Sequence, residues 1–121
     1  MIDHMTIKVR DFEKAVAFYD AALAPLGYAR GVAFPGVQQF AAGDGSSVFV
    51  STAGADDAVA PVHVAFHAPD TDAVAAFHTA GLANGGTDNG APGPRPHYGP
   101  NYYAAFVHDP EGNNIEAVIN S

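Results

Sequence analysis

IDHMTIKVRDFEKAVAFYDAALAPLG, residues 2–27, aligns without a gap with PVHVAFHAPDTDAVAAFHTAGLANGG, residues 61–86, at an offset of 59 positions. Three of the identical pairs in this alignment are alanines, which mean little in an Ala-rich chain, so the evidence for a repeat comes from the other five. The identical pairs are His4/His63, Asp11/Asp70, Ala17/Ala76, Phe18/Phe77, Ala21/Ala80, Leu23/Leu82, Ala24/Ala83 and Gly27/Gly86. The repeat predicts that one structural unit occurs twice in this chain.

Each copy of the repeat predicts a strand followed by a helix. Residues 2–9 alternate between apolar and polar side chains, which is typical of a half-buried strand. Asp11 then stands where a helix N-cap is needed, and Pro25 with Gly27 ends the helical pattern. Asp70 opens the corresponding helix of the second copy.

Three further strands are expected after each helix, and in both halves a glycine turn precedes the last one. Gly45 and Gly112 supply the positive φ that hairpin turns require. In the second half, the first of the three falls in an irregular stretch, because seven of the residues 87–101 are Pro or Gly. The other strands are expected at 29–34, 37–42, 46–51, 102–108 and 113–120.

The predicted fold class is therefore α+β, with two βαβββ repeats forming a curved mixed sheet, or cup. We expect a single domain over residues 1–121. Its first module spans 1–52, its linker 53–60 and its second module 61–121. A chain of this length buries enough surface to fold without disulfides.

Composition excludes several classes of function. The chain carries 13 acidic residues against five Lys and Arg, a formal net charge of −8, which argues against nucleic acid and anionic membrane as partners. It has no cysteine, which excludes disulfides, Cys-ligated zinc and iron–sulfur clusters. With neither a long apolar segment nor a basic leader, the expected location is cytoplasmic.

The alternation of side chains places three metal-ligand candidates on one face of the sheets. His4 and His63 lie on the side of their strands opposite the helices, and Glu116 takes the same side of the last strand. If the halves close into a cup, these residues form a set of two imidazoles and one carboxylate. Such a set suits a divalent Fe, Mn, Ni or Zn ion with positions open to substrate. The alternative interpretation is a sheet with one solvated face, where polar residues simply meet water.

A second concentration of polar and aromatic residues follows in 93–103. Prolines stiffen this stretch, so Arg95, His97 and Tyr98 are candidates for clamping an anionic substrate or for acid–base work beside the metal. His97 is the preferred base or extra ligand, and Tyr103 is a candidate substrate contact. Alternatively, this is a rigid surface loop whose rings pack over the sheet. Other aromatic residues are assigned to the core: Phe12, Phe18, Tyr19, Phe66, Phe77 and Phe106.

These features resemble the vicinal oxygen chelate superfamily, which includes glyoxalase I, bleomycin-resistance proteins, fosfomycin-resistance transferases and extradiol dioxygenases. The resemblance covers essentially the whole chain, and its most specific segment is DPEGNNIE at 109–116. The other matching segments are DHM at 3–5, FY at 18–19, LG at 26–27 and HVAF at 63–66. The resemblance implies that His4, His63 and Glu116 hold the metal.

One position departs from the glyoxalase I pattern. Aligning the last strands of the two halves on their turns places Phe49 opposite Glu116, where glyoxalase I has a second carboxylate. Simple glyoxalase I isomerisation is therefore in doubt. Three-ligand members of the superfamily exist, namely the iron-dependent extradiol dioxygenases and the manganese-dependent fosfomycin-resistance transferases.

The leading hypothesis is a glyoxalase-like, divalent-metal-dependent enzyme that chelates adjacent oxygens of a small substrate by lyase, isomerase or transferase chemistry. Its catalytic candidates are His97, Tyr98 and Glu116, and its substrate contacts are Phe49, Arg95 and Tyr103. The second hypothesis is a bleomycin-resistance-like binding protein without catalysis, and the third is an extradiol-type dioxygenase. The resemblance also implies a homodimer, with modules paired within one chain or swapped between two.

Overall fold

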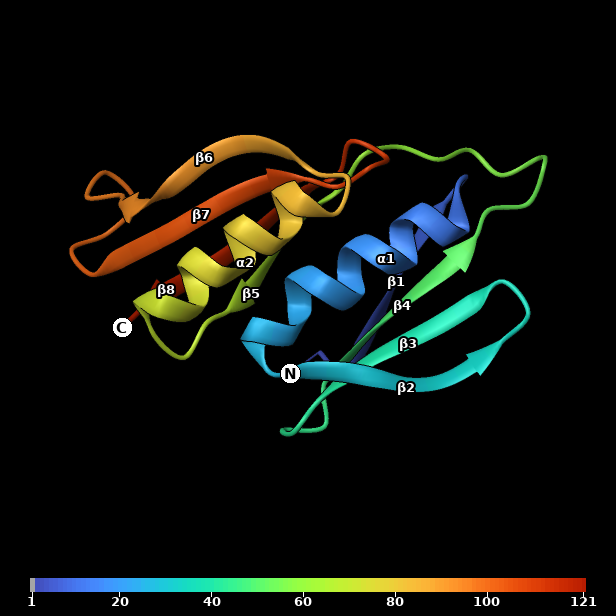
Figure 1. The fold of residues 1–121 in the computed structure, drawn as a ribbon, viewed down its shortest axis with the longest axis horizontal. Helices are drawn as coiled ribbons and strands as arrows, with labels where there is room; N and C mark the ends of the chain where they lie inside the picture. Colours follow the sequence, from blue (N-terminus) through green and yellow to red (C-terminus); the bar gives the residue numbers. More distant parts are fainter. Residues whose placement is uncertain (1) are drawn as a thin grey trace.

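The computed structural model describes residues 2–121, in which the order βαβββ occurs twice (Figure 1). The first half contains β1 (His4–Val9), α1 (Phe12–Leu23), a short 3₁₀ helix (Ala24–Leu26), β2 (Tyr28–Phe34), β3 (Val37–Ala42) and β4 (Ser47–Thr52). The second contains β5 (His63–His67), α2 (Thr71–Ala83), β6 (Thr87–Pro94), β7 (Tyr102–His108) and β8 (Asn114–Asn120). This order confirms the predicted α+β class.

Both helices begin at the aspartates that the repeat singled out. The carboxylate of Asp11 accepts a hydrogen bond from the backbone N–H of Lys14, and that of Asp70 accepts one from Ala73. These bonds satisfy backbone donors that have no partner inside the helix. After α1, Gly27 adopts a φ of 94°, which glycine tolerates at a helix C-terminus. Neither helix is long and apolar enough to span a membrane.

The strands form two four-stranded sheets, ordered β1-β4-β3-β2 and β5-β8-β7-β6. β1 pairs with β4 and β5 with β8 in parallel, whereas the remaining pairs are antiparallel. Among the described residues the two sheets stay separate, so one chain does not form a continuous curved sheet. β1 and β5 are consequently edge strands with one side unpaired among residues 2–121.

β6 is the element that the sequence placed least well. It crosses the Pro/Gly-rich stretch that predicted irregular structure, and it pairs with β7 despite Pro92 and Pro94. Its register shifts between Asp88 and Gly90 and again between Gly90 and Gly93. Edge position and bulges explain the tolerance, because an edge strand can leave some backbone groups outside the ladder.

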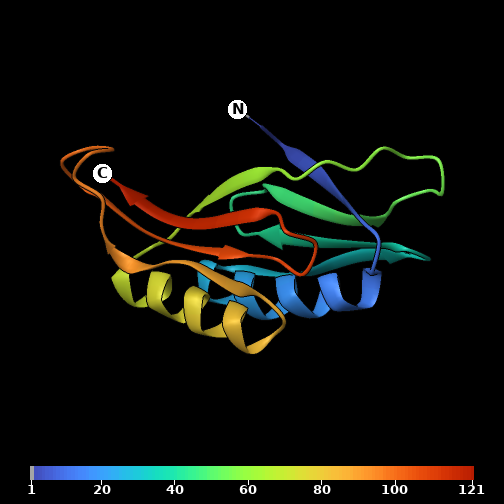
Figure 2. The same cartoon turned by 90° about the horizontal axis from the view of Figure 1, so that it is seen from above.

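Both helices lie on the same side of the strands and pack against each other (Figures 1 and 2). The core is one cluster of buried residues drawn from both halves. Its largest members include Phe18 and Tyr19 of α1 and Phe77 of α2, none of them exposed. The sheet faces that carry His4 and Glu116 are the faces turned away from this core.

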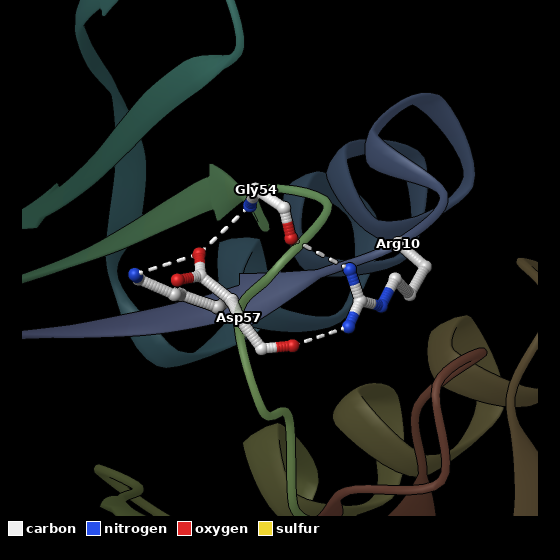
Figure 3. A network of polar contacts seen from close by, with 4 residues as sticks. Arg10, Gly54 and Asp57 are labelled. Atoms are coloured by element: carbon white, nitrogen blue, oxygen red, sulfur yellow. Dashed lines mark hydrogen bonds and ion pairs between the residues drawn. The ribbon is translucent and has the colours of Figure 1, made fainter.

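A polar network holds the segment between the two halves (Figure 3). The Arg10 guanidinium donates to the carbonyl oxygens of Gly54 and Asp57 at 2.9 and 2.6 Å. The Asp57 carboxylate accepts from the Gly54 N–H at 2.7 Å and pairs with Lys8 Nζ at 3.0 Å. These bonds lower the pKa of Asp57, the Gly54 bond contributing most. From the second half, the Glu111 carboxylate accepts the backbone N–H of Arg10.

Candidate functional site

Glu116 and His63 meet on neighbouring strands of the second sheet. The parallel register places Ala65 of β5 opposite Glu116 of β8, and His63 lies two residues earlier on the same face of β5. His63 Nε2 lies 2.8 Å from Glu116 Oε1. The Glu116 side chain is only 2% exposed, whereas that of His63 is 52% exposed. A buried carboxylate therefore stands behind an accessible imidazole.

Tyr102 of β7 is the second partner of this carboxylate. Its hydroxyl donates a hydrogen bond to Glu116 Oε2, so both carboxylate oxygens are engaged. Burial, together with the hydrogen bond to Glu116 and its negative charge, raises the pKa of Tyr102 to about 12. The phenol is therefore protonated at neutral pH and acts as a donor that orients Glu116.

These residues line a pocket of about 530 Å³ with largely aromatic walls. The Tyr98 and Tyr102 rings meet edge to face with centroids 5.2 Å apart, and His97 lies against Tyr98 at 4.2 Å. Phe106 pairs with Glu116 across the antiparallel β7–β8 ladder and completes the wall. The lining residues are His63, His97, Tyr98, Tyr102, Phe106 and Glu116.

The first sheet carries a corresponding face in which a phenyl ring replaces the carboxylate. The β1–β4 register pairs Thr6 with Phe49, as the β5–β8 register pairs Ala65 with Glu116. Phe49 therefore stands at the strand position that Glu116 has in the second half. The His4 and Phe49 rings meet edge to face with centroids 5.5 Å apart, and His4 Nδ1 lies 2.7 Å from the Asp3 carboxylate.

A single chain does not gather the three metal-ligand candidates. Within residues 2–121, no group of three or more His, Cys, Asp or Glu side chains is placed to hold a metal ion. The chain joins His63 to Glu116 and leaves His4 outside that pair.

The chemistry of this donor pair suits a divalent ion. Bound to one ion at metal–ligand distances of about 2.0 to 2.2 Å, an imidazole nitrogen and a carboxylate oxygen lie roughly 2.8 to 3.1 Å apart at a right angle and roughly 3.3 to 3.6 Å apart at a tetrahedral angle. His63 Nε2 and Glu116 Oε1 lie 2.8 Å apart in a direct hydrogen bond, which an ion bound to both atoms would replace. Both are donors that Fe, Mn, Ni and Zn accept. One imidazole and one carboxylate make an incomplete site, which a further donor must complete.

The structure changes the assignment of two aromatic residues. Tyr103, a candidate substrate contact in the sequence, packs against the hydrophobic core, and Tyr102 faces the pocket instead. Phe106, assigned to the core, lines the pocket, so that assignment is wrong. Side chains alternate along β7, so the pocket face follows once its pairing with Glu116 is known. The sequence held this signal, because the turn at 109–113 sets the pairing.

His97, Tyr98 and Arg95 lie close to this pocket but differ in position. His97 and Tyr98 are exposed at its wall, the Tyr98 residue being 59% exposed. Arg95 lies in an adjoining pocket, against the ring of Phe106.

Comparison with known proteins extends this description to the family level. Residues 1–117 match the family model described as the Glyoxalase/Bleomycin resistance protein/Dioxygenase superfamily. None of the curated proteins matches the chain. A glyoxalase/bleomycin resistance protein from Albidiferax ferrireducens T118 is similar in structure, with 32% identity, a TM-score of 0.84, and coverage of 100% of this chain and 99% of that one.

Two more distant solved structures share the fold. The fosfomycin resistance protein FosX from Mesorhizobium loti has 18% identity and a TM-score of 0.71, over 100% of this chain and 92% of its own. Lactoylglutathione lyase from Agrobacterium tumefaciens has 23% identity and a TM-score of 0.71, over 98% and 92%. With the family model matching nearly the whole chain, this protein belongs to the Glyoxalase/Bleomycin resistance protein/Dioxygenase superfamily.

Proposed function

We propose that this protein is a glyoxalase-like metalloenzyme that acts on a small substrate with two adjacent oxygens. The observation that carries the proposal is the buried Glu116 carboxylate, which lies 2.8 Å from the exposed His63 imidazole at the wall of a pocket. Hydrogen bonds to both oxygens compensate the burial of this carboxylate, and the exposed imidazole beside it leaves the pair accessible to a ligand. The solved enzymes with this fold include a lactoylglutathione lyase.

His63 and Glu116 are the residues that would hold a divalent Fe, Mn, Ni or Zn ion in this chain. Such an ion, when bound, polarises adjacent substrate oxygens and stabilises negative charge on them. Tyr102 orients the carboxylate, and His97 at the pocket wall accepts or returns a substrate proton. Tyr98 and Phe106 enclose the apolar part of the substrate.

We propose further that His4 of a second copy completes the ligand set in a homodimer. Two observations support this arrangement: His4 lies outside the His63–Glu116 pair, and the edge strands β1 and β5 have one side unpaired within residues 2–121. Phe49, half-buried beside His4, would then face the pocket of the other copy as an apolar wall.

Metal content tests the ligand assignment. The protein purified from cells should contain about one divalent ion per chain by elemental analysis, and H4A, H63A and E116A should each lose it. His67 lies on the same face of β5 as His63 but is absent from the pocket lining, so H67A is the matched control and should retain the metal. Full retention by E116A in a folded protein would refute the proposed site.

Mixed dimers test the origin of His4. H4A and E116A, carrying different affinity tags, are co-expressed and their heterodimer is isolated. If the site is shared between copies, one of the two sites in this heterodimer keeps all its ligands, and half of the metal returns. If each site belongs to one chain, both sites stay defective and no metal returns.

A second candidate function is drug sequestration without catalysis, as the family name includes bleomycin resistance. The aromatic lining by Tyr98, Tyr102 and Phe106 favours it, because such rings stack on flat or cationic ligands. The two functions differ in their need for metal. Thermal-shift screening of vicinal dioxygen compounds should give metal-dependent stabilisation for the enzyme, whereas bleomycin should stabilise a sequestering protein after chelator treatment.

A further inference from the structure

Beside the His63–Glu116 pocket lies a second, polar pocket of about 370 Å³. The two pockets share Tyr98 and Phe106 as walls, so they are neighbouring compartments on one face of the second sheet. The lining residues of the second pocket are Asn89, Gly90, Arg95, Tyr98, Phe106 and Asn114. We call this second compartment the Arg95 pocket.

Backbone carbonyl groups and the Phe106 ring hold the Arg95 side chain in place. Its guanidinium donates to the carbonyl oxygens of Ala91 at 2.8 Å and Gly93 at 2.9 Å, and lies 5.5 Å from the centroid of the Phe106 ring. A Cβ at Gly90 would stand 3.2 Å from Arg95 Nη2, and one at Gly93 would stand 3.3 Å from Nη1. Glycine at both positions therefore leaves the space that the guanidinium occupies.

The positive charge of Arg95 has no carboxylate partner in the part of the chain that the structure describes. Among the ion pairs of residues 2–121, none involves Arg95. The acids near it are engaged elsewhere: Asp88 accepts from His78 and the Gly90 N–H, and Glu116 accepts from Tyr102 and contacts His63. The protein around it carries a net charge of −8. An unpaired, immobilised guanidinium in such a protein is suited to bind an anion.

The donors around the pocket match that interpretation. A guanidinium has five N–H donors. Arg95 makes three backbone hydrogen bonds, one of them long at 3.4 Å, so at least two donors remain for a ligand. In the same pocket, the Asn89 side-chain amide donates to the Asn114 side-chain oxygen at 3.2 Å, and the remaining amide N–H groups of these two residues add further donors.

We propose that the Arg95 pocket binds a carboxylate at the far end of the substrate, while the substrate's adjacent oxygens enter the His63–Glu116 pocket. This inference rests on the proposed function for the identity of the first compartment. It assigns the substrate class, a small acid that carries a vicinal dioxygen group at one end and a carboxylate at the other. The shared walls imply a short spacer between the two ends.

The first experiment needs no metal. Inorganic phosphate, as a small anionic probe, is titrated into chelator-treated protein and followed by ¹H–¹⁵N NMR. We expect saturable shifts at Asn89, Gly90, Asn114 and the Arg95 Nε–H. The amides of Asn89, Gly90 and Asn114 are present in wild type and in the variants, so they report the phosphate affinity of each. R95Q should lower that affinity roughly tenfold or more, as expected when a charged hydrogen-bond donor is lost, and R95K should retain part of it. R30Q, which alters an exposed arginine paired with Asp20, is the matched control.

The second experiment uses metal-loaded protein and matched ligands. Oxaloacetate, 2-oxoglutarate and 2-oxoadipate each carry a distal carboxylate on a different spacer, and 2-oxopentanoate lacks it. At least one diacid should bind tighter than 2-oxopentanoate by roughly tenfold, and R95Q should abolish that difference while metal content stays unchanged.

The outcomes separate the two proposals. If the wild-type protein binds no metal, the proposed function is refuted. The phosphate titration would still show whether the Arg95 pocket binds an anion. Phosphate shifts that are absent, or that are the same in R95Q, would show that Arg95 only stiffens its loop. Equal binding of all four oxoacids to metal-loaded protein would also overturn the assigned substrate class.

Discussion

Phe49 occupies in the first half of the chain the strand position that Glu116 occupies in the second. Both stand opposite the residue two places after a histidine, Thr6 in one case and Ala65 in the other. The consequence is chemical asymmetry within a structural repeat: on the neighbouring strand, His63 meets a carboxylate 2.8 Å away, whereas His4 meets a phenyl ring. The metal site proposed above would thus have three protein ligands and an apolar wall.

Replacing this phenyl ring by a carboxylate should strengthen metal binding. F49E would add a fourth donor at the half-buried position beside His4, and we expect affinity for divalent metal to rise about tenfold or more. Competition against a chromophoric chelator measures the change. F49L, which stays apolar, should match the wild-type affinity. An unchanged affinity in F49E would show that this face does not reach the ion.

Removing the Tyr102 hydroxyl should loosen the ligand that it orients. Y102F deletes the donor to Glu116 Oε2, and loss of such a supporting bond typically costs about 10- to 100-fold in metal affinity. Y103F is the control, since Tyr103 packs on the other face of β7 against the core. The same chelator competition applies. Equal affinities in the two variants would mean that Glu116 is held without Tyr102.

The buried bond between Tyr19 and Asp109 should support stability. The Tyr19 hydroxyl donates to Asp109 Oδ2, and Y19F leaves that buried acceptor with one donor fewer. We expect a loss of about 1 to 3 kcal/mol in the free energy of unfolding, measured with urea. Y28F, at a tyrosine that is only partly buried, should cost less. A loss as small as that of Y28F would argue against the importance of the bond.

The same tyrosine predicts a pH dependence. Burial, together with the charge of Asp109 and the hydrogen bond to it, raises the pKa of Tyr19 well above 10.0. Above pH 10, the unfolded chain therefore loses this proton before the folded chain does, and stability should fall as pH rises. Urea unfolding between pH 8 and 11 should show a shallower fall for Y19F. Parallel curves for Y19F and wild type would contradict the assignment.

The linker network should protect the segment 53–60 from proteolysis. D57N removes the charge that pairs with Lys8 while keeping a side-chain acceptor for Gly54, and R10Q removes the donor to the Gly54 and Asp57 carbonyls. We expect faster cleavage within 53–60 in both variants, and mass spectrometry of the fragments measures the rate. If both variants are cleaved at the wild-type rate, the network does not protect this segment.

The same network predicts a pH dependence. Because the pKa of Asp57 is lowered, the protection in wild type should persist above the ordinary value of 3.8 and fade as pH falls below it.

Much of the fold could be predicted from local pattern. Asp11 and Asp70 mark both helix starts because a cap depends on residues within one turn. Alternation placed His63 and Glu116 on one face because the period of a strand is two residues. β6 was harder to predict, since its prolines and glycines oppose a strand locally and pairing with β7 overrides them.

The sequence by itself determined the duplication, the strand faces, and the equivalence of Phe49 in the first half to Glu116 in the second. All three follow from short-range periodicity and an internal alignment. The β7–β8 pairing that brings Tyr102 rather than Tyr103 to Glu116, and Phe106 to the pocket, also lay within reach of the sequence, because the short turn at 109–113 sets it. Only the tertiary structure decided that His4 stays apart from His63 within residues 2–121 and that α1 packs on α2. These outcomes depend on contacts between the two halves, whose residues are far apart in sequence, and no local pattern records them.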